Sequence, residues 1–280
     1  MRREVLVVGG GGELGTAMAS RIGSGSTVLM ASRDERHPAP LATALREADI
    51  EVRTHPVDVT SAASVAELAA HAAELGDVRR VVHTAGVSPA HASVQSIPQT
   101  NLAGTATVLE HFGPVMAAGG AAVVMASTGG SFAAPLSPAE EHALAWTPAA
   151  ELLDLACAAP ARFDHRGEAY SFTKRATQLR VRAASIDWAR HGARINSISP
   201  GVVANTMGTA ELDGIWGPVI KGMLEGSAAQ RPATMPAVAA AAGFLLGPDS
   251  VYITGIDLLL DGGVTAAITT GHLDPAALLP

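Results

Sequence analysis

Apolar residues occur along the chain in short continuous runs that are bounded by glycine and polar residues. Runs of this kind are typical of strands buried on both faces of a parallel sheet. Stretches with helical spacing separate most of these runs, as expected for alternating strands and helices. We therefore predict an α/β fold, a Rossmann-like doubly wound parallel sheet of about seven strands with helices on both faces. The predicted strands are residues 5–8, 27–31, 51–59, 78–84, 121–127, 193–198 and 253–260.

Two segments interrupt this alternation, at about residues 128–168 and 202–232. The first contains Pro135, Pro138 and Pro148, and the second is irregular with short helical parts. Long irregular segments commonly carry function, so we interpret both as lids over a pocket. We expect residues 1–280 to form a single domain, with a tail after about residue 265. The predicted helices are residues 16–22, 39–48, 61–73, 99–112, 151–158, 170–191 and 236–246.

The composition excludes several classes of partner and site. The net charge of -7 comes without a basic block, which argues against nucleic acid or an anionic membrane as partner. No apolar stretch approaches the roughly 20 residues of a membrane span, and we expect a cytoplasmic protein. Cys157 is the only cysteine, so an internal disulfide is excluded and a reducing compartment is favoured. His83 and His91 lack partners at ligand spacing and are interpreted as structural, so no metal site is predicted.

A glycine-rich loop follows the first predicted strand and precedes a helical stretch. Gly10, Gly12 and Gly15 fit the spacing G-x-G-x-x-G, whereas Gly9, Gly12 and Gly15 fit a G-x-x-G-x-x-G variant. Both spacings allow a tight turn, close approach to a pyrophosphate and a helix N-terminus directed at it. Glycine clusters also form plain turns, but the strand before this loop and the helix after it favour dinucleotide binding.

Residues at the ends of the second and third predicted strands bear on the cofactor. A small residue followed by arginine, as in Ser32-Arg33, leaves room for the 2'-phosphate of NADP and neutralises it. Asp34 keeps NAD open as the alternative, because an acidic residue there can hold the ribose hydroxyls. Asp58 ends the third strand, where it can accept a hydrogen bond from adenine or serve as a helix N-terminal residue.

The stretch Tyr170-Ser171-Phe172-Thr173-Lys174 opens the longest predicted helix. Tyr170 and Lys174 are four residues apart and therefore share one helix face. A neighbouring ammonium favours the phenolate and brings its pKa from about 10 toward the working range. The pair could exchange a proton with an alcohol oxygen. The same spacing also arises by chance on amphipathic helices, so other residues must decide.

Two further polar residues stand where ligands bind in such folds. Ser127 ends the fifth predicted strand, and open α/β sheets bind ligands at the carboxyl ends of their strands. Asn101 lies in the first turns of a predicted helix, where asparagine usually only carries a small cost. Ala85-Gly86, after the fourth strand, allows a ligand to approach the backbone. Taken singly, Ser127 is an ordinary loop hydroxyl and Asn101 a solvent-exposed side chain.

In combination, these motifs resemble the short-chain dehydrogenase/reductase family, in its compact single-domain branch. The resemblance extends from Val5 to Gly263. It rests on eight features in the family's order, namely the Gly9 to Gly15 loop, Asp58-Val59, Thr84-Ala85-Gly86, Asn101, Ser127, Tyr170 with Lys174, Pro200-Gly201 with Thr206, and Asp261-Gly262-Gly263.

The resemblance implies roles for individual residues. Tyr170 would be the general acid or base, Lys174 would lower its pKa and contact the nicotinamide ribose, Ser127 would hold the substrate oxygen, and Asn101 would position a water. Tyr170 and Lys174 would also contact the cofactor. The other cofactor-binding residues implied are Gly9, Gly10, Gly12, Glu13, Leu14, Gly15, Ser32, Arg33, Asp58, Val59, Ala85, Gly86, Pro200, Gly201, Val203, Thr206 and Met207.

The chain departs from the family pattern in three places. Glu13 stands where the family commonly has its second glycine, and a carboxylate near a phosphate is unfavourable unless it turns outward. His83-Thr84 replaces the usual pair of asparagines before Ala-Gly. The interval from Ser127 to Tyr170 is much longer than usual, which is similar to bacterial 3α-hydroxysteroid dehydrogenase/carbonyl reductase, where an inserted segment covers the active site.

The expected function is NADP(H)-dependent hydride transfer to a ketone or imine, or from a secondary alcohol. Five apolar residues of the two irregular segments suggest a roomy pocket for a bulky or natural-product-like substrate: Phe132, Trp146, Met207, Trp216 and Met223. The alternatives are an NAD-dependent, hydroxysteroid-like alcohol dehydrogenase and a dinucleotide-sensing module without turnover. The resemblance also implies a homodimer or homotetramer, with the helix of Tyr170 and the C-terminal strand region at the interfaces.

Overall fold

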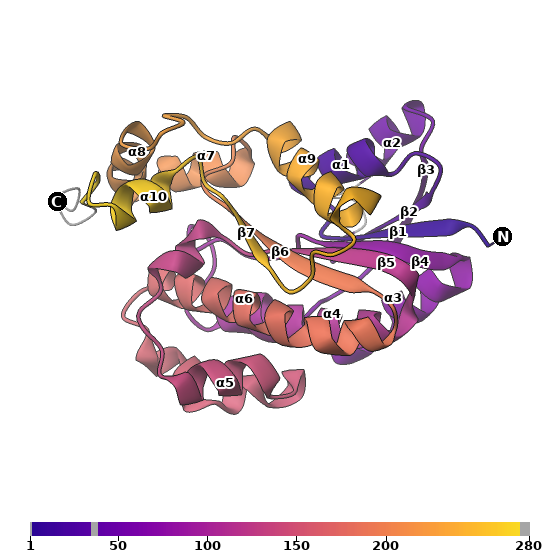
Figure 1. Ribbon diagram of the computed structural model, residues 1–280, viewed down its shortest axis with the longest axis horizontal. Helices are drawn as coiled ribbons and strands as arrows, with labels where there is room; N and C mark the ends of the chain where they lie inside the picture. The colour runs from indigo at the N-terminus through magenta and orange to yellow at the C-terminus, as the bar shows by residue number, and fades with distance from the viewer. Residues whose placement is uncertain (1, 35–38, 275–280) are drawn as a thin grey trace.

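Seven parallel strands form one sheet, in the order β3-β2-β1-β4-β5-β6-β7 (Figure 1). The computed structural model describes residues 2–34 and 39–274. The prediction of a Rossmann-like sheet is confirmed. The chain adds β2 and β3 on one side of β1 and then adds β4 to β7 on its other side, and such folds bind ligands at this switch between β1 and β4. The strands are β1 (Glu4–Gly9), β2 (Thr27–Ser32), β3 (Glu51–Pro56), β4 (Asp77–His83), β5 (Met116–Met125), β6 (Arg194–Pro200) and β7 (Asp257–Leu260).

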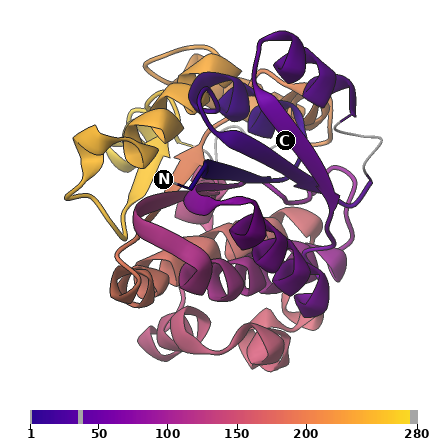
Figure 2. The same ribbon diagram turned by 90° about the vertical axis from the view of Figure 1, so that its right-hand side faces the viewer.

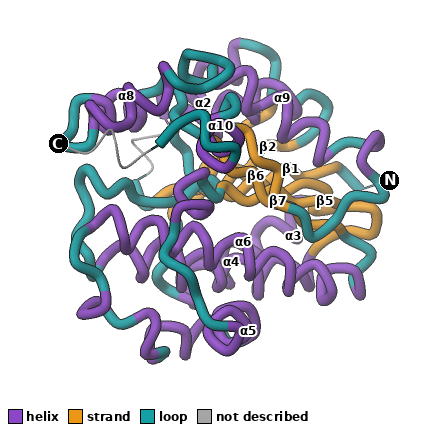
Figure 3. Tube along the Cα trace, turned by 60° about the vertical axis from the view of Figure 1, so that its left-hand side comes forward, coloured by secondary structure: helices purple, strands orange, loops and turns teal. Residues whose placement is uncertain are grey.

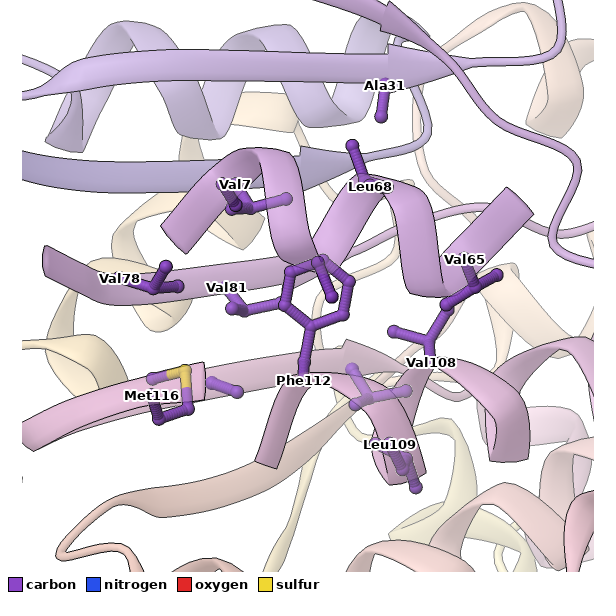
Figure 4. Packing of buried hydrophobic residues seen from close by; sticks show 14 of the residues in the cluster. Val7, Ala31, Val65, Leu68, Val78, Val81, Val108, Leu109, Phe112 and Met116 are labelled. Atoms are coloured by element: carbon purple, nitrogen blue, oxygen red, sulfur yellow. The ribbon is translucent and has the colours of Figure 1, made fainter. Parts of the chain in front are cut away.

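Helices cover both faces of the twisted sheet (Figures 1 and 2). One face carries α1 (Glu13–Ile22), α2 (Ala39–Glu47) and α9 (Met235–Leu246), and the other carries α3 (Ala62–Leu75), α4 (Thr105–Phe112) and α6 (Arg166–Arg190). The central strands are buried on both sides, so their short aliphatic residues pack against both helix layers. Figure 4 shows Phe112 of α4 among aliphatic side chains of α3, β1 and β4, within one of these two layers.

A third layer lies outside α4 and α6, below them in Figure 1. It consists of α5 (Pro138–Trp146) and the 3-10 turns Ala149–Asp154, Ala156–Ala158 and Pro160–Arg162. Leu144, Leu152 and Phe163 bury this layer against Phe172 of α6. The prediction of an α-helix at 151–158 is therefore wrong, because these residues form two 3-10 turns.

Helix α5 was not predicted, although its start has a sequence signal. Ser137 accepts a hydrogen bond from Glu140 N at 3.3 Å, and the Glu140 carboxylate accepts one from Ser137 N at 2.8 Å, which completes a capping box. Pro138 occupies the first helical turn, where proline is favoured. The prolines of this segment suggested an irregular structure, whereas this one helps to begin a helix.

Three short helices lie beyond the carboxyl ends of the strands, namely α7 (Thr206–Leu212), α8 (Gly217–Glu225) and α10 (Val264–Thr269) (Figures 1 and 3). A tail is predicted after about residue 265, but helix α10 continues to Thr269. Within the described part of the chain, no helix is both long and apolar enough to cross a membrane.

Candidate active site

The glycine-rich loop forms a cradle at the carboxyl end of β1. Gly10 has φ +106°, and a Cβ there would lie 2.5 Å from Ala85 N. A Cβ on Gly15 would collide with Gly10 O. At Gly12, which caps α1 without a side-chain hydrogen bond, a Cβ would meet nothing within 4 Å. The loop is therefore closed toward the sheet and open above the start of α1, which fits a pyrophosphate placed on the helix N-terminus.

The carboxylate of Glu13 turns toward α7. Its Oε2 accepts a hydrogen bond from Thr206 N at 3.0 Å, and the residue is exposed. The unusual residue of the glycine loop thus ties this loop to the first turn of α7. Glu13 is also the acidic residue in the first turn of α1, where the helix dipole favours a negative charge.

Thr84 fastens the cradle to β4, and His83 lies buried behind it. Thr84 Oγ1 donates to Gly10 O at 2.9 Å. His83 is 2% exposed, and its Nε2 lies 3.2 Å from Thr105 Oγ1. Burial, reinforced by the charge of Lys174, lowers the pKa of His83 to about 4, so this imidazole is neutral. Its Nδ1 has no hydrogen-bond partner within the described residues, so His83 is structural but only half satisfied.

The predicted adenosine-side residues lie around the ends of β2 and β3. Ser32 Oγ donates to Asp34 O at 2.8 Å, and Arg33 is exposed. Asp58 Oδ1 accepts hydrogen bonds from Thr60 N at 2.9 Å and Thr60 Oγ1 at 2.7 Å. These bonds, with a smaller contribution from Arg33, hold the pKa of Asp58 below its ordinary value.

The alternative that Asp58 begins the following helix is wrong. Ser61 is the N-cap of α3 and accepts a hydrogen bond from Ser64 N at 3.3 Å. Asp58 precedes that cap by three residues and forms a local turn with Thr60. Asp58 lies two residues after the end of β3, within range of the charge of Arg33.

Ser127, Tyr170 and Lys174 meet at the carboxyl edge of the sheet. Ser127 follows β5 and its hydroxyl is hydrogen-bonded to Tyr170. Lys174 Nζ lies 5.5 Å from the centroid of the Tyr170 ring and donates to Met125 O at 2.9 Å. His165 caps α6 and starts this helix at Arg166, so Tyr170 sits in its second turn and not at its beginning.

The pKa values in this cluster depend mainly on burial. Burial raises the pKa of Tyr170 above its ordinary value, Glu211 adds to the rise, and the hydrogen bond from Ser127 opposes it. Burial lowers the pKa of Lys174 to about 8, against the effect of Glu211. Burial therefore dominates the pKa of Tyr170 in this arrangement, with the Lys174 ammonium over the face of its ring, and a lowering of that pKa by Lys174 stays a prediction.

Asn101 lies in a π-helical turn, Pro98–Gly104, that precedes α4. Its Oδ1 accepts from Val87 N at 2.8 Å and its Nδ2 donates to Val87 O at 3.0 Å. A Cβ on Gly86 would lie 3.2 Å from Asn101 Oδ1 and 3.9 Å from Lys174 Nζ. Asn101 is thus buried against the loop after β4 and close to Lys174, which rules out the solvent-exposed alternative. Single π-turns are frequent at functional sites.

The end of β6 and the start of α7 border the same edge. Pro200 ends β6, and Gly201 N donates to Leu260 O at 3.0 Å. Val203 pairs with Ala233 in an isolated bridge. Thr206 and Met207 then begin α7. These residues lie at the carboxyl edge of the sheet, as do the cradle and Tyr170.

Asp261 of the predicted Asp-Gly-Gly motif supports the turn that follows Ser127. Its carboxylate accepts from Thr128 Oγ1 at 3.2 Å and from Thr265 N at 2.8 Å. These and the bond from Gly263 N keep the pKa of Asp261 low despite burial. The C-terminal motif thus helps to fix the turn that follows Ser127, through the contact of Asp261 with Thr128.

Sequence reasoning missed Glu211 and Ser88. Ser88 Oγ donates to Glu211 Oε1 at 3.0 Å and joins the loop after β4 to α7. Burial raises the pKa of Glu211, while Ser88 and Lys174 oppose that rise. No spacing in the sequence relates residue 211 to Tyr170, because only the tertiary fold brings α7 over this site.

The two irregular segments meet above the site, but not all of their aromatic residues do. The rings of His165 and Trp216 lie 5.6 Å apart, which joins the segments 128–168 and 202–232. Trp146 instead lines a cavity of about 230 Å³ between α4, α5 and the C-terminal half of α6. The α6 residues that line it, Arg180 to Trp188, lie about 15–27 Å along the helix from Tyr170 at about 1.5 Å per residue. Trp146 therefore does not line the expected substrate pocket, contrary to expectation.

Known protein families and structures match almost the whole chain. Residues 3–139 match the short chain dehydrogenase family, and residues 139–265 match the model described as enoyl-(acyl carrier protein) reductase. The short-chain dehydrogenase/reductase bsc3 of Alternaria brassicicola is 34% identical over 96% of this chain and 98% of its own length. D-threitol dehydrogenase of Mycolicibacterium smegmatis is 30% identical over 93% of this chain and 92% of its own.

A solved short-chain type dehydrogenase/reductase from Mycobacterium ulcerans has the same fold. Its TM-score is 0.73 at 21% identity, over 94% of this chain and 90% of that one. The fold, the order of the motifs and the near full-length relatives agree. The chain therefore belongs to the short-chain dehydrogenase/reductase family, whose members are NAD(P)-dependent oxidoreductases.

Proposed function

We propose that this protein is an NADP(H)-dependent enzyme that transfers a hydride between the nicotinamide and a ketone or imine, chiefly in the direction of reduction. One observation carries the proposal: Ser127, Tyr170 and Lys174 meet at the carboxyl edge of the sheet, beside an open glycine cradle. A hydroxyl, a phenol and an ammonium so placed can polarise a carbonyl oxygen and protonate it.

Each residue of this cluster has a distinct task. The nicotinamide supplies the hydride when it is bound. Tyr170 donates a proton to the carbonyl oxygen, which the Ser127 hydroxyl also holds, while Lys174 contributes positive charge and binds the ribose. Asn101 fixes the loop after β4 and positions a water near Lys174.

Tyr170 is protonated at neutral pH and can act as the acid in reduction, since burial raises its pKa further above neutrality. Oxidation of an alcohol requires the phenolate as a base and therefore a more alkaline solution. The preference for reduction rests on the expected use of NADPH, the cofactor that usually drives reductions.

The cofactor preference rests on the turn after β2. Ser32 is small, Arg33 is exposed, and its charge acts on Asp58 at the end of β3. A guanidinium there would bind a 2'-phosphate. For Arg33→Asp we expect the NADPH affinity to fall at least about tenfold, with a smaller change for NADH. Arg190→Asp, with the same charge change at the exposed end of α6, serves as the control. An unchanged preference for NADPH after Arg33→Asp would show that Arg33 does not bind the 2'-phosphate.

The alternative function is an NAD-dependent secondary-alcohol dehydrogenase. D-threitol dehydrogenase, one of the near full-length relatives, is named for oxidation of an alcohol. Asp34, next to Arg33, could hold the ribose hydroxyls of NAD. The two functions differ in cofactor and direction but use the same Ser127, Tyr170 and Lys174.

The segment 202–232 would border the substrate pocket as a lid, together with the two ends of the segment 128–168 beside Ser127 and Tyr170, because residues 138–162 form the layer outside α4 and α6. Phe132 is 38% exposed, and Met207 and Trp216 are each 43% exposed. Apolar side chains exposed beside a reaction centre support a bulky, largely apolar substrate. The contact between His165 and Trp216 would open or shift when such a substrate enters.

We expect a homodimer or homotetramer. In the C-terminal strand region Val251 is 70% and Tyr252 100% exposed, and Leu259 of the edge strand β7 is 40% exposed. Such a patch supports an interface at this edge of the sheet. The N-terminal half of α6 packs against α5 and its neighbouring turns. Ile186, in its C-terminal half, is 58% exposed and supports the second expected interface there. Light scattering after size exclusion measures the state.

The first test of the function is cofactor binding followed by turnover. Fluorescence titration should give tighter binding of NADPH than of NADH, and apolar ketones should then be reduced with NADPH. Tighter binding of NADH together with oxidation of alcohols would establish the alternative. Failure to bind either dinucleotide would reject both functions.

A further inference from the structure

A carboxylate lies beside the residues that exchange the proton, and the proposed reaction does not use it. Ser88 joins Glu211 of α7 to the loop after β4, in which a Cβ on Gly86 would lie 3.9 Å from Lys174 Nζ. In agreement with this position, the charge of Glu211 raises the pKa of both Tyr170 and Lys174. Glu211 does not form a direct ion pair with Lys174 among the described residues, because the ammonium binds Met125 O and Glu211 binds Ser88. A buried carboxylate is costly to desolvate, and hydrogen-bond donors to its oxygens reduce that cost.

The backbone and one side chain hold this carboxylate in place. Ser88 Oγ donates to Glu211 Oε1 at 3.0 Å. The start of α7 is held by the hydrogen bond from Thr206 N to Glu13. Just beyond the end of α7, the ring of Trp216 lies against that of His165 at a tilt of 40°. Glu211 Oε2 accepts no hydrogen bond in the described part of the chain, which leaves one fixed, unused acceptor at the site.

The charges around the site determine which donor suits this acceptor. Lys174 already supplies one positive charge near Glu211. An ammonium group on the substrate would therefore be repelled by Lys174, whereas a neutral hydroxyl would not. A substrate carboxylate would be repelled by Glu211 itself. The best partner is a neutral hydroxyl next to the reacting carbon.

We propose that Glu211 is a specificity-determining residue that accepts a hydrogen bond from a hydroxyl beside the reacting carbonyl, so that the protein prefers α-hydroxy ketones and their vicinal diols. This inference rests on the proposed function and names its substrate class. In reduction, the cofactor's hydride adds to the carbonyl carbon and Tyr170 protonates its oxygen, which gives a diol and the oxidised cofactor. The neighbouring hydroxyl is unchanged and serves only for recognition.

Three ketones of one skeleton test the inference: acetophenone, 2-hydroxyacetophenone and phenylglyoxylate. We expect kcat/KM for 2-hydroxyacetophenone to exceed that for acetophenone about 10- to 100-fold, as for a hydrogen bond to a charged group. Phenylglyoxylate should be the poorest of the three. Glu211→Ala should bring the first two ketones to equal kcat/KM, and Glu211→Gln should reduce the preference and improve phenylglyoxylate.

A matched control is Glu225→Gln, which changes an exposed carboxylate of α8. It should leave all three values unchanged. A merely structural role of Glu211 would lower kcat/KM for the three ketones by the same factor. An unchanged ratio between 2-hydroxyacetophenone and acetophenone in Glu211→Ala overturns the inference.

A binding experiment separates this inference from the proposed function. Calorimetry measures the affinities of 1-phenylethane-1,2-diol and 1-phenylethanol. The protein is first loaded with whichever dinucleotide binds, and it is used free if neither binds. Tighter binding of the diol, lost in Glu211→Ala, supports the role of Glu211 even if no ketone is reduced, and then only the proposed function fails. Equal binding of diol and monool overturns the role of Glu211, whatever the activity.

Discussion

The cofactor side and the substrate side of the candidate site are built in different ways. On the cofactor side, Gly10, Gly15 and Thr84 close a loop through backbone geometry and one short hydrogen bond to the backbone. On the substrate side, single side-chain contacts join elements that lie far apart in the sequence, such as Ser88 with Glu211. The cofactor side therefore depends on the packing of the sheet, whereas the substrate side can change without disturbing the fold.

This difference predicts where substitutions act. A change on the cofactor side should alter stability or dinucleotide binding. A change on the substrate side should alter turnover or KM and leave the fold intact. Three substitutions, each with a matched control elsewhere in the chain, and one comparison of two glycines within the cradle test this contrast.

The largest effect is expected for Tyr170→Phe. Removal of the phenol hydroxyl eliminates the proton donor, and kcat for ketone reduction should fall about 10²- to 10⁴-fold. Dinucleotide affinity and the unfolding midpoint should remain close to those of the wild type. The control is Tyr252→Phe, because Tyr252 is 100% exposed and is the only other tyrosine. A kcat that survives Tyr170→Phe would remove Tyr170 from the reaction.

Lys174→Met should lower activity but stabilise the fold at neutral pH. The unfolded chain holds this proton up to a pKa of about 10.5, whereas burial lowers the pKa of Lys174 to about 8. Below pH 8 the folded state carries the full cost of the buried charge, roughly 3 kcal/mol at 1.36 kcal/mol per pKa unit.

Between pH 8 and 10.5 the unfolded state binds more protons than the folded state, so the wild type gains stability as the pH rises. Urea unfolding at pH 7, 8, 9 and 10 should therefore show the gain from Lys174→Met shrinking with pH. Lys221→Met, at the only other lysine, which is exposed, should show no such pH dependence. A constant difference between variant and wild type would contradict the lowered pKa.

Two glycines of the cradle should respond differently to alanine. Gly15→Ala places a methyl group against Gly10 O and 2.8 Å from Val8 Cγ1, and should destabilise the fold by about 1–3 kcal/mol. Gly12→Ala meets nothing within 4 Å and should change stability by less than about 1 kcal/mol. Its methyl group nevertheless projects above the loop and should weaken dinucleotide binding. Equal loss of stability in both variants would break the distinction between the closed and the open side of the cradle.

The smallest effect is expected for Trp216→Ala, which removes the contact with His165 between the two lids. The pair is expected to contribute about 0.5–1.5 kcal/mol, so KM for a bulky ketone should rise about 2- to 10-fold. Trp146→Ala is the control, because Trp146 lies beside the C-terminal half of α6. If both variants raised KM equally, the lid contact would have no special part in substrate binding.

The cofactor side could be predicted closely from the sequence. The glycine spacing, Ser127 after a strand, and Tyr170 four residues before Lys174 depend on local periodicity and on the rule that parallel strands expose their carboxyl ends at one edge. The structure brings these groups together, with Asn101 in a π-turn beside them. The prediction of helices failed mainly at α5, where the capping box of Ser137 and Glu140 was overlooked among prolines.

The sequence by itself determined the alternation of strands and helices, the glycine loop and the four-residue spacing of Tyr170 and Lys174, because each depends on neighbours within one or two turns of the chain. Only the tertiary structure decided the pKa of Tyr170, since burial and the charge of Glu211 come from distant segments. It also decided that Glu13 faces α7 and that Trp146 lies away from the site. Desolvation and long-range contacts depend on which surfaces the fold brings together, and no local pattern specifies those surfaces.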